Sequence, residues 1–86
     1  MGTNDEDAAM LIELGKQIQF ARIALGLSQL QLIEATGLGD STIRRIEKGT
    51  RSATITQLGK IAQALGITVG ELAGRAEQAI ESSKDD

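Results

Sequence analysis

The chain of 86 residues lacks cysteine, histidine, proline, tryptophan and tyrosine, and Phe20 is its only aromatic residue. Without cysteine or histidine it can form no disulfide, no thiolate or imidazole metal site, and no Cys-His or Ser-His catalytic pair. It also lacks the D-x-D-x-D-G loop of calcium sites and the glycine-rich loop that cradles phosphates. We therefore expect neither an enzyme nor a bound metal or cofactor.

Long apolar runs are absent as well. No stretch approaches the ~18 residues that a membrane span needs, and no basic start precedes an apolar signal-peptide core. Hydrophobic residues make up 41% of the chain and charged residues 24%, which is typical of globular proteins. A chain of this length forms one domain with a small core. We expect a soluble cytoplasmic protein without a membrane partner.

The chain as a whole has no surplus of basic residues. Nine Lys and Arg stand against twelve Asp and Glu, and the net charge of −3 by itself argues against a nucleic-acid partner. The charges are segregated, however: residues 1–15 carry −4, residues 16–60 carry +4 and residues 61–86 carry −3. Four bases of the middle segment lie close together, namely Arg44, Arg45, Lys48 and Arg51. They form either a solvated helix face or a site for an anionic partner.

The apolar residues recur with the helical period throughout, and three capping boxes mark helix starts. The boxes begin at Ser28, Thr54 and Thr68, and each follows a glycine suited to end the preceding helix, namely Gly26, Gly49 and Gly66. Together these signals predict an all-α fold with helices at about residues 5–25, 28–36, 40–48, 55–65 and 69–82. We expect residues 1–4 and 83–86 to be frayed.

The helices predicted at 28–36 and 40–48 are joined by Gly37-Leu38-Gly39, a connection typical of a helix-turn-helix motif. Apolar side chains are spaced to pack between these helices and onto their neighbours, namely Leu32, Leu38, Ile43 and Ile46. On the other side of the second helix, Ser41, Arg44 and Arg45 share a face. A short helix with an arginine-rich outer face suits the major groove of a duplex, which is ~12 Å wide.

At this point the sequence resembles the Cro and lambda-repressor-like family of helix-turn-helix domains, also called the xenobiotic-response-element (XRE) family. The matching stretches are LGKQI (residues 14–18), ALGLSQ (24–29), TGL (36–38), STIRRIEKG (41–49) and LGKIAQALGI (58–67). The resemblance implies a compact five-helix domain that binds operator DNA, generally as a dimer. We expect the helix-turn-helix domain to span residues 11–73, after an acidic helical start (1–10) and before a C-terminal helical extension (74–86).

The resemblance also implies roles for single residues. The positions that face bases are Asp40, Ser41, Arg44 and Arg45. The positions that contact phosphates are Gln29, Lys48 and Arg51. Thr42 is expected on the helix surface, where any contact it makes would be to phosphate. The pair Arg22 and Glu47 matches an ion pair that ties the first helix to the end of the third.

General chemistry leaves several of these roles open. Arg44 and Arg45 could each bond guanine O6 and N7 or contact phosphate. Ser41 could touch a base, a phosphate or neither. Asp40 either stabilises the helix N-terminus or accepts a hydrogen bond from a cytosine amino group. Gln29 and the neighbouring amides form a phosphate clamp, or Gln29 is an ordinary exposed residue.

The last predicted helix carries an apolar stripe of candidate dimer-interface residues, namely Val69, Leu72, Ala76, Ala79 and Ile80. For Val69 and Leu72, burial in the core of their own chain is the favoured interpretation. The later members of the stripe are expected to lie beyond the compact domain, with little of their own chain to pack against. A dimer would place two recognition helices ~34 Å apart on a twofold-symmetric operator.

The leading prediction is a homodimeric transcriptional regulator that binds specific double-stranded DNA. The alternative is an antitoxin-type or other protein-binding module that keeps the fold, with DNA binding secondary or lost. The acidic ends and the apolar Leu30 favour the alternative, whereas the basic quartet disfavours it. A protein partner, such as a toxin or a polymerase, is compatible with both.

Overall fold

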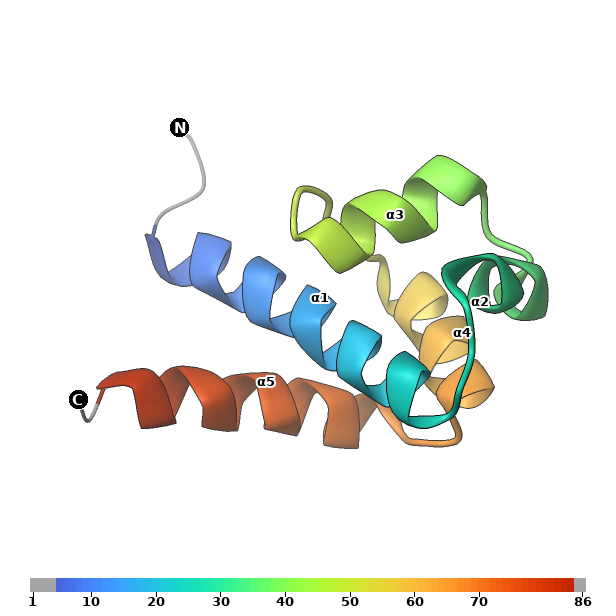
Figure 1. Ribbon diagram of the computed structural model, residues 1–86. Helices are drawn as coiled ribbons and strands as arrows, with labels where there is room; N and C mark the ends of the chain where they lie inside the picture. The colour runs from blue at the N-terminus through green and yellow to red at the C-terminus, as the bar shows by residue number, and fades with distance from the viewer. Residues whose placement is uncertain (1–4, 85–86) are drawn as a thin grey trace.

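The computed structural model describes residues 5–84, and five helices account for most of that range (Figure 1). The helices are α1 (Asp5–Ala24), α2 (Gln29–Thr36), α3 (Asp40–Lys48), α4 (Ile55–Leu65) and α5 (Val69–Lys84). The described part of the chain contains no strand, so the all-α prediction is confirmed. The fraying predicted for residues 1–4 and 85–86 lies outside the described residues. Ser83 and Lys84 belong to α5, so the fraying predicted for them is wrong; no glycine after Gly74 interrupts the helix.

The helix boundaries follow from local hydrogen bonds, as predicted. In the box that opens α2, the Gln31 amide donates to the Ser28 hydroxyl at 3.0 Å and the Ser28 amide donates to the Gln31 side chain at 2.8 Å. The reciprocal pairs also form at Thr54 before α4 and at Thr68 before α5. The three predicted C-terminal glycines all have positive φ. The starts of α2, α4 and α5 and the ends of α1, α3 and α4 are therefore set by neighbouring residues.

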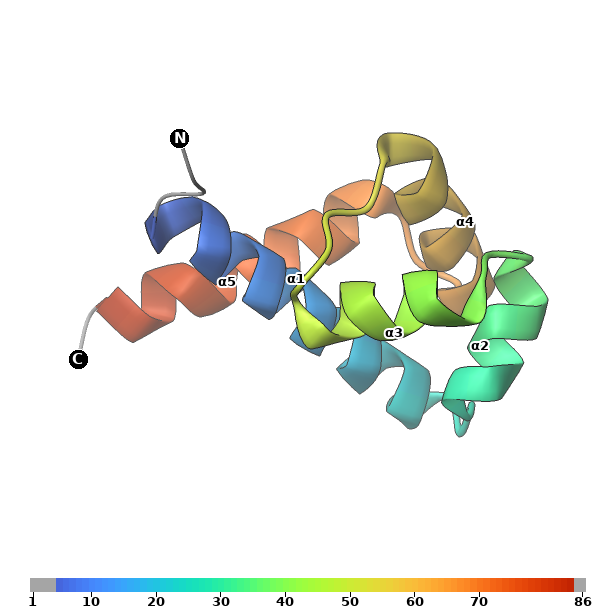
Figure 2. The same cartoon turned by 90° about the horizontal axis from the view of Figure 1, so that it is seen from above.

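The core draws a buried side chain from every helix, which fixes how the helices pack. Its buried members are Ile18, Leu32, Ile43, Ile46, Leu58, Ile61, Leu65 and Leu72, and Leu38 packs against them from the connection between α2 and α3. Ile43 and Ile46 belong to α3 and are 1% and 2% exposed. Because these two side chains anchor the inner face of α3, its outer face is held toward solvent (Figure 2).

The α5 helix folds back beside α1, and this pair has the most extensive contact between helices (Figure 1). Leu72 and Ala76 are each 0% exposed, because their own chain covers them. This agrees with the core interpretation of Leu72 and leaves neither residue available to a dimer partner. Val69, Ala79 and Ile80 are half-buried. The expectation that the later residues of α5 lack packing partners is therefore wrong, because α1 is long enough to cover them. Within residues 5–84, no helix combines the length and apolar character needed to cross a membrane.

Candidate nucleic-acid interface

The outer face of α3 gathers the residues predicted to face bases. Ile43, Ile46 and Glu47 are the buried residues of this helix. The exposed ones include all four predicted base-facing residues, Asp40, Ser41, Arg44 and Arg45. The structure thus brings the four onto the solvent side of one short helix.

The residues predicted to contact phosphates lie around that face. Lys48 is the last residue of α3, Arg51 follows in the loop before α4, and both are exposed. Thr42 is half-buried on α3, and Gln29 is half-buried as the first residue of α2. Gln29 touches the α3 face directly, because its Oε1 accepts a hydrogen bond from Arg44 Nη1 at 2.5 Å. Gln29 is therefore not an isolated surface residue.

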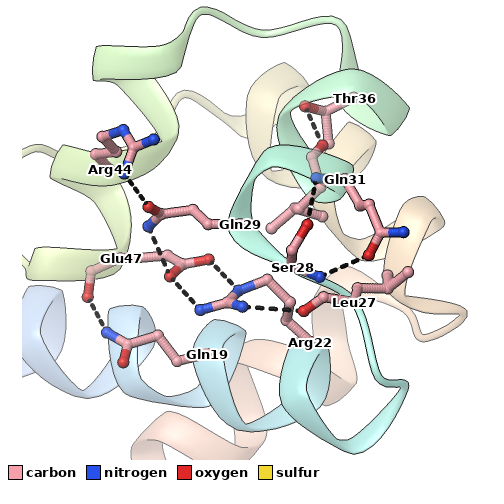
Figure 3. Close-up of polar contacts among 10 residues, drawn as sticks. Gln19, Arg22, Leu27, Ser28, Gln29, Gln31, Thr36, Arg44 and Glu47 are labelled. Carbon is pink, nitrogen blue, oxygen red and sulfur yellow. Dashed lines mark hydrogen bonds and ion pairs between the residues drawn. The ribbon is translucent and has the colours of Figure 1, made fainter.

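A buried carboxylate joins three helices beneath this face (Figure 3). The Glu47 side chain is 4% exposed and its Oε2 accepts from Arg22 Nε at 2.8 Å. Its Oε1 accepts from Arg22 Nη2 and from Gln29 Nε2, each at 3.1 Å. A bidentate arginine and a further donor are what a buried carboxylate needs to offset its desolvation. The predicted partners Arg22 and Glu47 thus form an ion pair that ties α1 to α3, while Gln29 adds α2.

Asp40 and Arg44 form a second ion pair, which is exposed. Arg44 Nε donates to Asp40 Oδ1 at 2.5 Å and Arg44 Nη2 donates to Asp40 Oδ2 at 3.3 Å. These hydrogen bonds hold the pKa of Asp40 below its ordinary value and raise the pKa of Arg44 above its own. Gly39 is the N-cap residue of α3, without a side-chain cap. The Asp40 carboxylate is therefore bonded to Arg44 rather than to the helix N-terminus.

Two residues of α1 also shape this site, although they were absent from the predicted set. Gln19 Nε2 donates to the backbone carbonyl of Glu47 at 2.7 Å. Gly15 lies so close to α3 that an added Cβ would be 2.4 Å from the same carbonyl oxygen. Gly15, Gln19 and Arg22 are spaced by four and three residues, which places them on one face of α1. That spacing, together with the predicted Arg22–Glu47 pair, is the signal that could have identified them.

Comparison with known proteins places this geometry in a family. The helix-turn-helix model HTH_3 matches residues 18–72. The restriction-modification controller protein C.AhdI from Aeromonas hydrophila is 35% identical, with a TM-score of 0.69 over 72% of this chain and 94% of that chain. A comparison with curated protein sequences found no match.

Two further solved structures are similar. The clp gene regulator ClgR from Corynebacterium glutamicum has a TM-score of 0.79 at 22% identity, over 90% of this chain and 84% of that chain; at that identity it shows the shared fold alone. An HTH_3 family transcriptional regulator from Vibrio cholerae has a TM-score of 0.74 at 28% identity, over 88% of this chain but 43% of that chain. With the family model and C.AhdI in agreement, this chain belongs to the HTH_3 family of helix-turn-helix proteins, which is the XRE-type family that its sequence resembles.

Proposed function

We propose that this protein is a sequence-specific DNA-binding transcriptional regulator whose α3 enters the major groove of a duplex. The observation that carries the proposal is the exposed face of α3, where Ser41, Arg44 and Arg45 are presented by a helix anchored through Ile43 and Ile46. An α-helix with side chains is about 10–12 Å wide and fits a groove ~12 Å wide. The similarity to a restriction-modification controller protein at 35% identity supports the same function.

Arg45 is the residue best placed to read a base directly. It is exposed on the same helix as Arg44, and its guanidinium makes no hydrogen bond or ion pair within the described residues. An unengaged guanidinium can donate two hydrogen bonds to guanine O6 and N7, which is worth ~1–3 kcal/mol of discrimination between base pairs. Arg45→Ala should therefore relax the preference at one operator position.

Phosphate contacts are assigned to Lys48, Arg51, Gln29 and Thr42, which surround the α3 face. One N–H of the Gln29 amide donates to Glu47 and the second remains available for a phosphate oxygen. Each phosphate neutralised by a basic side chain adds about 0.9 to the slope of log K against log salt. Neutralising Lys48 or Arg51 should weaken binding to all duplexes alike and reduce this slope by roughly that amount.

The decisive experiment is protection footprinting on the DNA beside the protein's own gene, followed by titration of the protected duplex with variants. Arg45→Ala should bind more weakly and discriminate less at one base pair, whereas the control Arg75→Ala should bind like the unaltered protein. Arg75 is exposed on α5, on the opposite side of α1 from α3 (Figure 1). If Arg45→Ala discriminates between base pairs as well as the unaltered protein does, Arg45 does not read a base.

We further propose that the protein acts as a homodimer on a twofold-symmetric operator. A single α3 offers four base-facing side chains, and each base pair read contributes only ~1–3 kcal/mol, so one copy has limited specificity. With Leu72 and Ala76 buried, the members of the apolar stripe on α5 that are still accessible to a partner are Val69, Ala79 and Ile80. Sedimentation of Ile80→Ser should show monomers. If Ile55→Ser, at a side chain that is 73% exposed on α4, gives monomers instead, α5 is not the interface.

A protein-binding module is the second candidate function, because several large apolar side chains of α1 and α2 are exposed. Phe20, Ile23 and Leu30 are 59%, 62% and 56% exposed, and such residues are common where a protein partner docks. A toxin or a polymerase would be partners of this kind. Salt dependence separates the two candidates: specific DNA binding weakens steeply as salt rises, whereas apolar docking does not.

A further inference from the structure

The Arg44 guanidinium is held from two sides in the free protein. Asp40 pairs with it along one edge, through Nε and Nη2. Gln29 accepts from Nη1 on the other side. Both contacts are made on an exposed surface, where a long arginine side chain would otherwise sample many rotamers. The orientation of this one guanidinium is therefore specified before any ligand arrives.

The Gln29 amide is itself oriented by the buried ion pair. Its Nε2 donates to Glu47 Oε1 at 3.1 Å, which requires its Oε1 to face the other way, toward Arg44. The flipped amide would present N–H groups to the guanidinium and an oxygen to the carboxylate, so both contacts would become repulsive. A chain of contacts thus runs from Arg22 in α1 through Glu47 and Gln29 to Arg44 (Figure 3).

This arrangement leaves two N–H donors of Arg44 free. A guanidinium has five N–H donors, and three of those on Arg44 are used by Asp40 and Gln29. The two that remain are one on Nη1 and one on Nη2, the terminal nitrogens. Two N–H donors are what the O6 and N7 acceptors of guanine in the major groove require.

We propose that Asp40 and Gln29 are positioning residues that aim the two remaining Nη donors of Arg44 at a G·C base pair, and that Asp40 keeps Arg44 from binding phosphates of unrelated DNA. The inference rests on the proposed function. If Arg44 swung to a phosphate, the Asp40 carboxylate would lose its partner beside a polyanion. Non-specific binding modes are therefore disfavoured, while a guanine contact leaves the Asp40–Arg44 pair intact.

The test compares Asp40→Asn with the charge-matched control Glu34→Gln, at an exposed carboxylate on α2. Affinities are measured by fluorescence anisotropy for the footprinted operator, for an operator with one G·C pair exchanged, and for an unrelated duplex. Asp40→Asn should reduce discrimination at one G·C position about tenfold. It should also steepen the salt slope for unrelated DNA by about 0.9, since the released Arg44 now neutralises a phosphate. Glu34→Gln should change neither quantity.

Asp40→Asn also removes the repulsion between Asp40 and phosphate, and this effect alone would raise the affinity for all duplexes together. A double-mutant cycle separates this effect from the positioning of Arg44. In an Arg44→Ala background, Asp40→Asn should leave the discrimination ratio unchanged. The inference is overturned if Asp40→Asn keeps the discrimination of the unaltered protein, or if it lowers discrimination equally without Arg44. If the unaltered protein protects no duplex at all, the proposed function fails, and this inference fails with it.

Discussion

Replacing Gly15 by alanine tests the closest approach between α1 and the end of α3. The new Cβ would lie 2.4 Å from the carbonyl oxygen of Glu47 and 2.7 Å from that of Ile46, whereas ordinary contacts begin near 3.4 Å. The two helices would have to separate locally by about 1 Å, because the opposing atoms are backbone and cannot rotate away. The same carbonyl of Glu47 accepts from Gln19 at 2.7 Å, so the shift also loosens that hydrogen bond.

Overpacking of this kind typically destabilises the folded protein by ~1–3 kcal/mol. In the opposite direction, alanine stabilises the interior of a helix by ~0.5–1 kcal/mol relative to glycine. We expect a net loss in the free energy of unfolding, measured by urea titration. Each kcal/mol corresponds to about 4–8 °C in melting temperature for a domain of this size.

The matched control is Gly59→Ala in the interior of α4, where an added Cβ meets no atom within 4 Å. That variant should be stabilised by ~0.5–1 kcal/mol, because it gains helix propensity without a clash. The two substitutions are chemically identical, so the difference between them isolates the contact with α3. A Gly15→Ala protein as stable as Gly59→Ala would refute the close approach of the helices.

The remaining predictions concern the ion pairs and one cap. Glu47→Ala should lower the free energy of unfolding by ~3–5 kcal/mol, because the largely buried Arg22 loses its counter-charge and keeps only its hydrogen bond to the Leu27 carbonyl; the Arg22→Met/Glu47→Leu double variant should lose less, and an equal loss would contradict this reasoning. Thr54→Ala should cost about 1 kcal/mol by removing the hydroxyl that accepts from the α4 backbone, and an unchanged melting temperature would speak against the cap. The hydrogen bonds from Arg44 lower the pKa of Asp40, so their stabilisation is present at neutral pH and is lost as pH falls through the lowered pKa. In Arg44→Ala the pKa of Asp40 should rise toward the ordinary aspartate value, which NMR titration of the carboxyl carbon measures; an unmoved midpoint would argue against the pair.

Much of the fold was predictable because its signals are local. Each capping box joins residues three apart, at Ser28, Thr54 and Thr68. The boxes therefore form as soon as the helix forms, whatever packs against it. The buried face of α3 followed from Ile43 and Ile46 by helical spacing alone.

The site was predictable in composition but not in its internal contacts. The four residues assigned to bases do share the exposed side of α3. The Arg22–Glu47 pair spans 25 residues, and only the family resemblance suggested it. The contact of Arg44 with Gln29 spans 15 residues and depends on the angle at which α2 meets α3, which no spacing in the sequence encodes.

The sequence by itself determined most of the helix boundaries, which face of α3 is apolar, and that a basic segment lies between two acidic ends. Hydrogen bonds within one turn and helical periodicity depend only on near neighbours, so the residue order was enough. The tertiary structure alone decided that Ala76 is buried where α5 packs against α1, that Gly15 lies against the end of α3, and that Asp40 and Gln29 hold Arg44. An apolar stripe looks the same whether its own chain or a second copy covers it, and a charge pattern does not reveal which carboxylate an arginine meets. Both depend on how helices distant in sequence pack together.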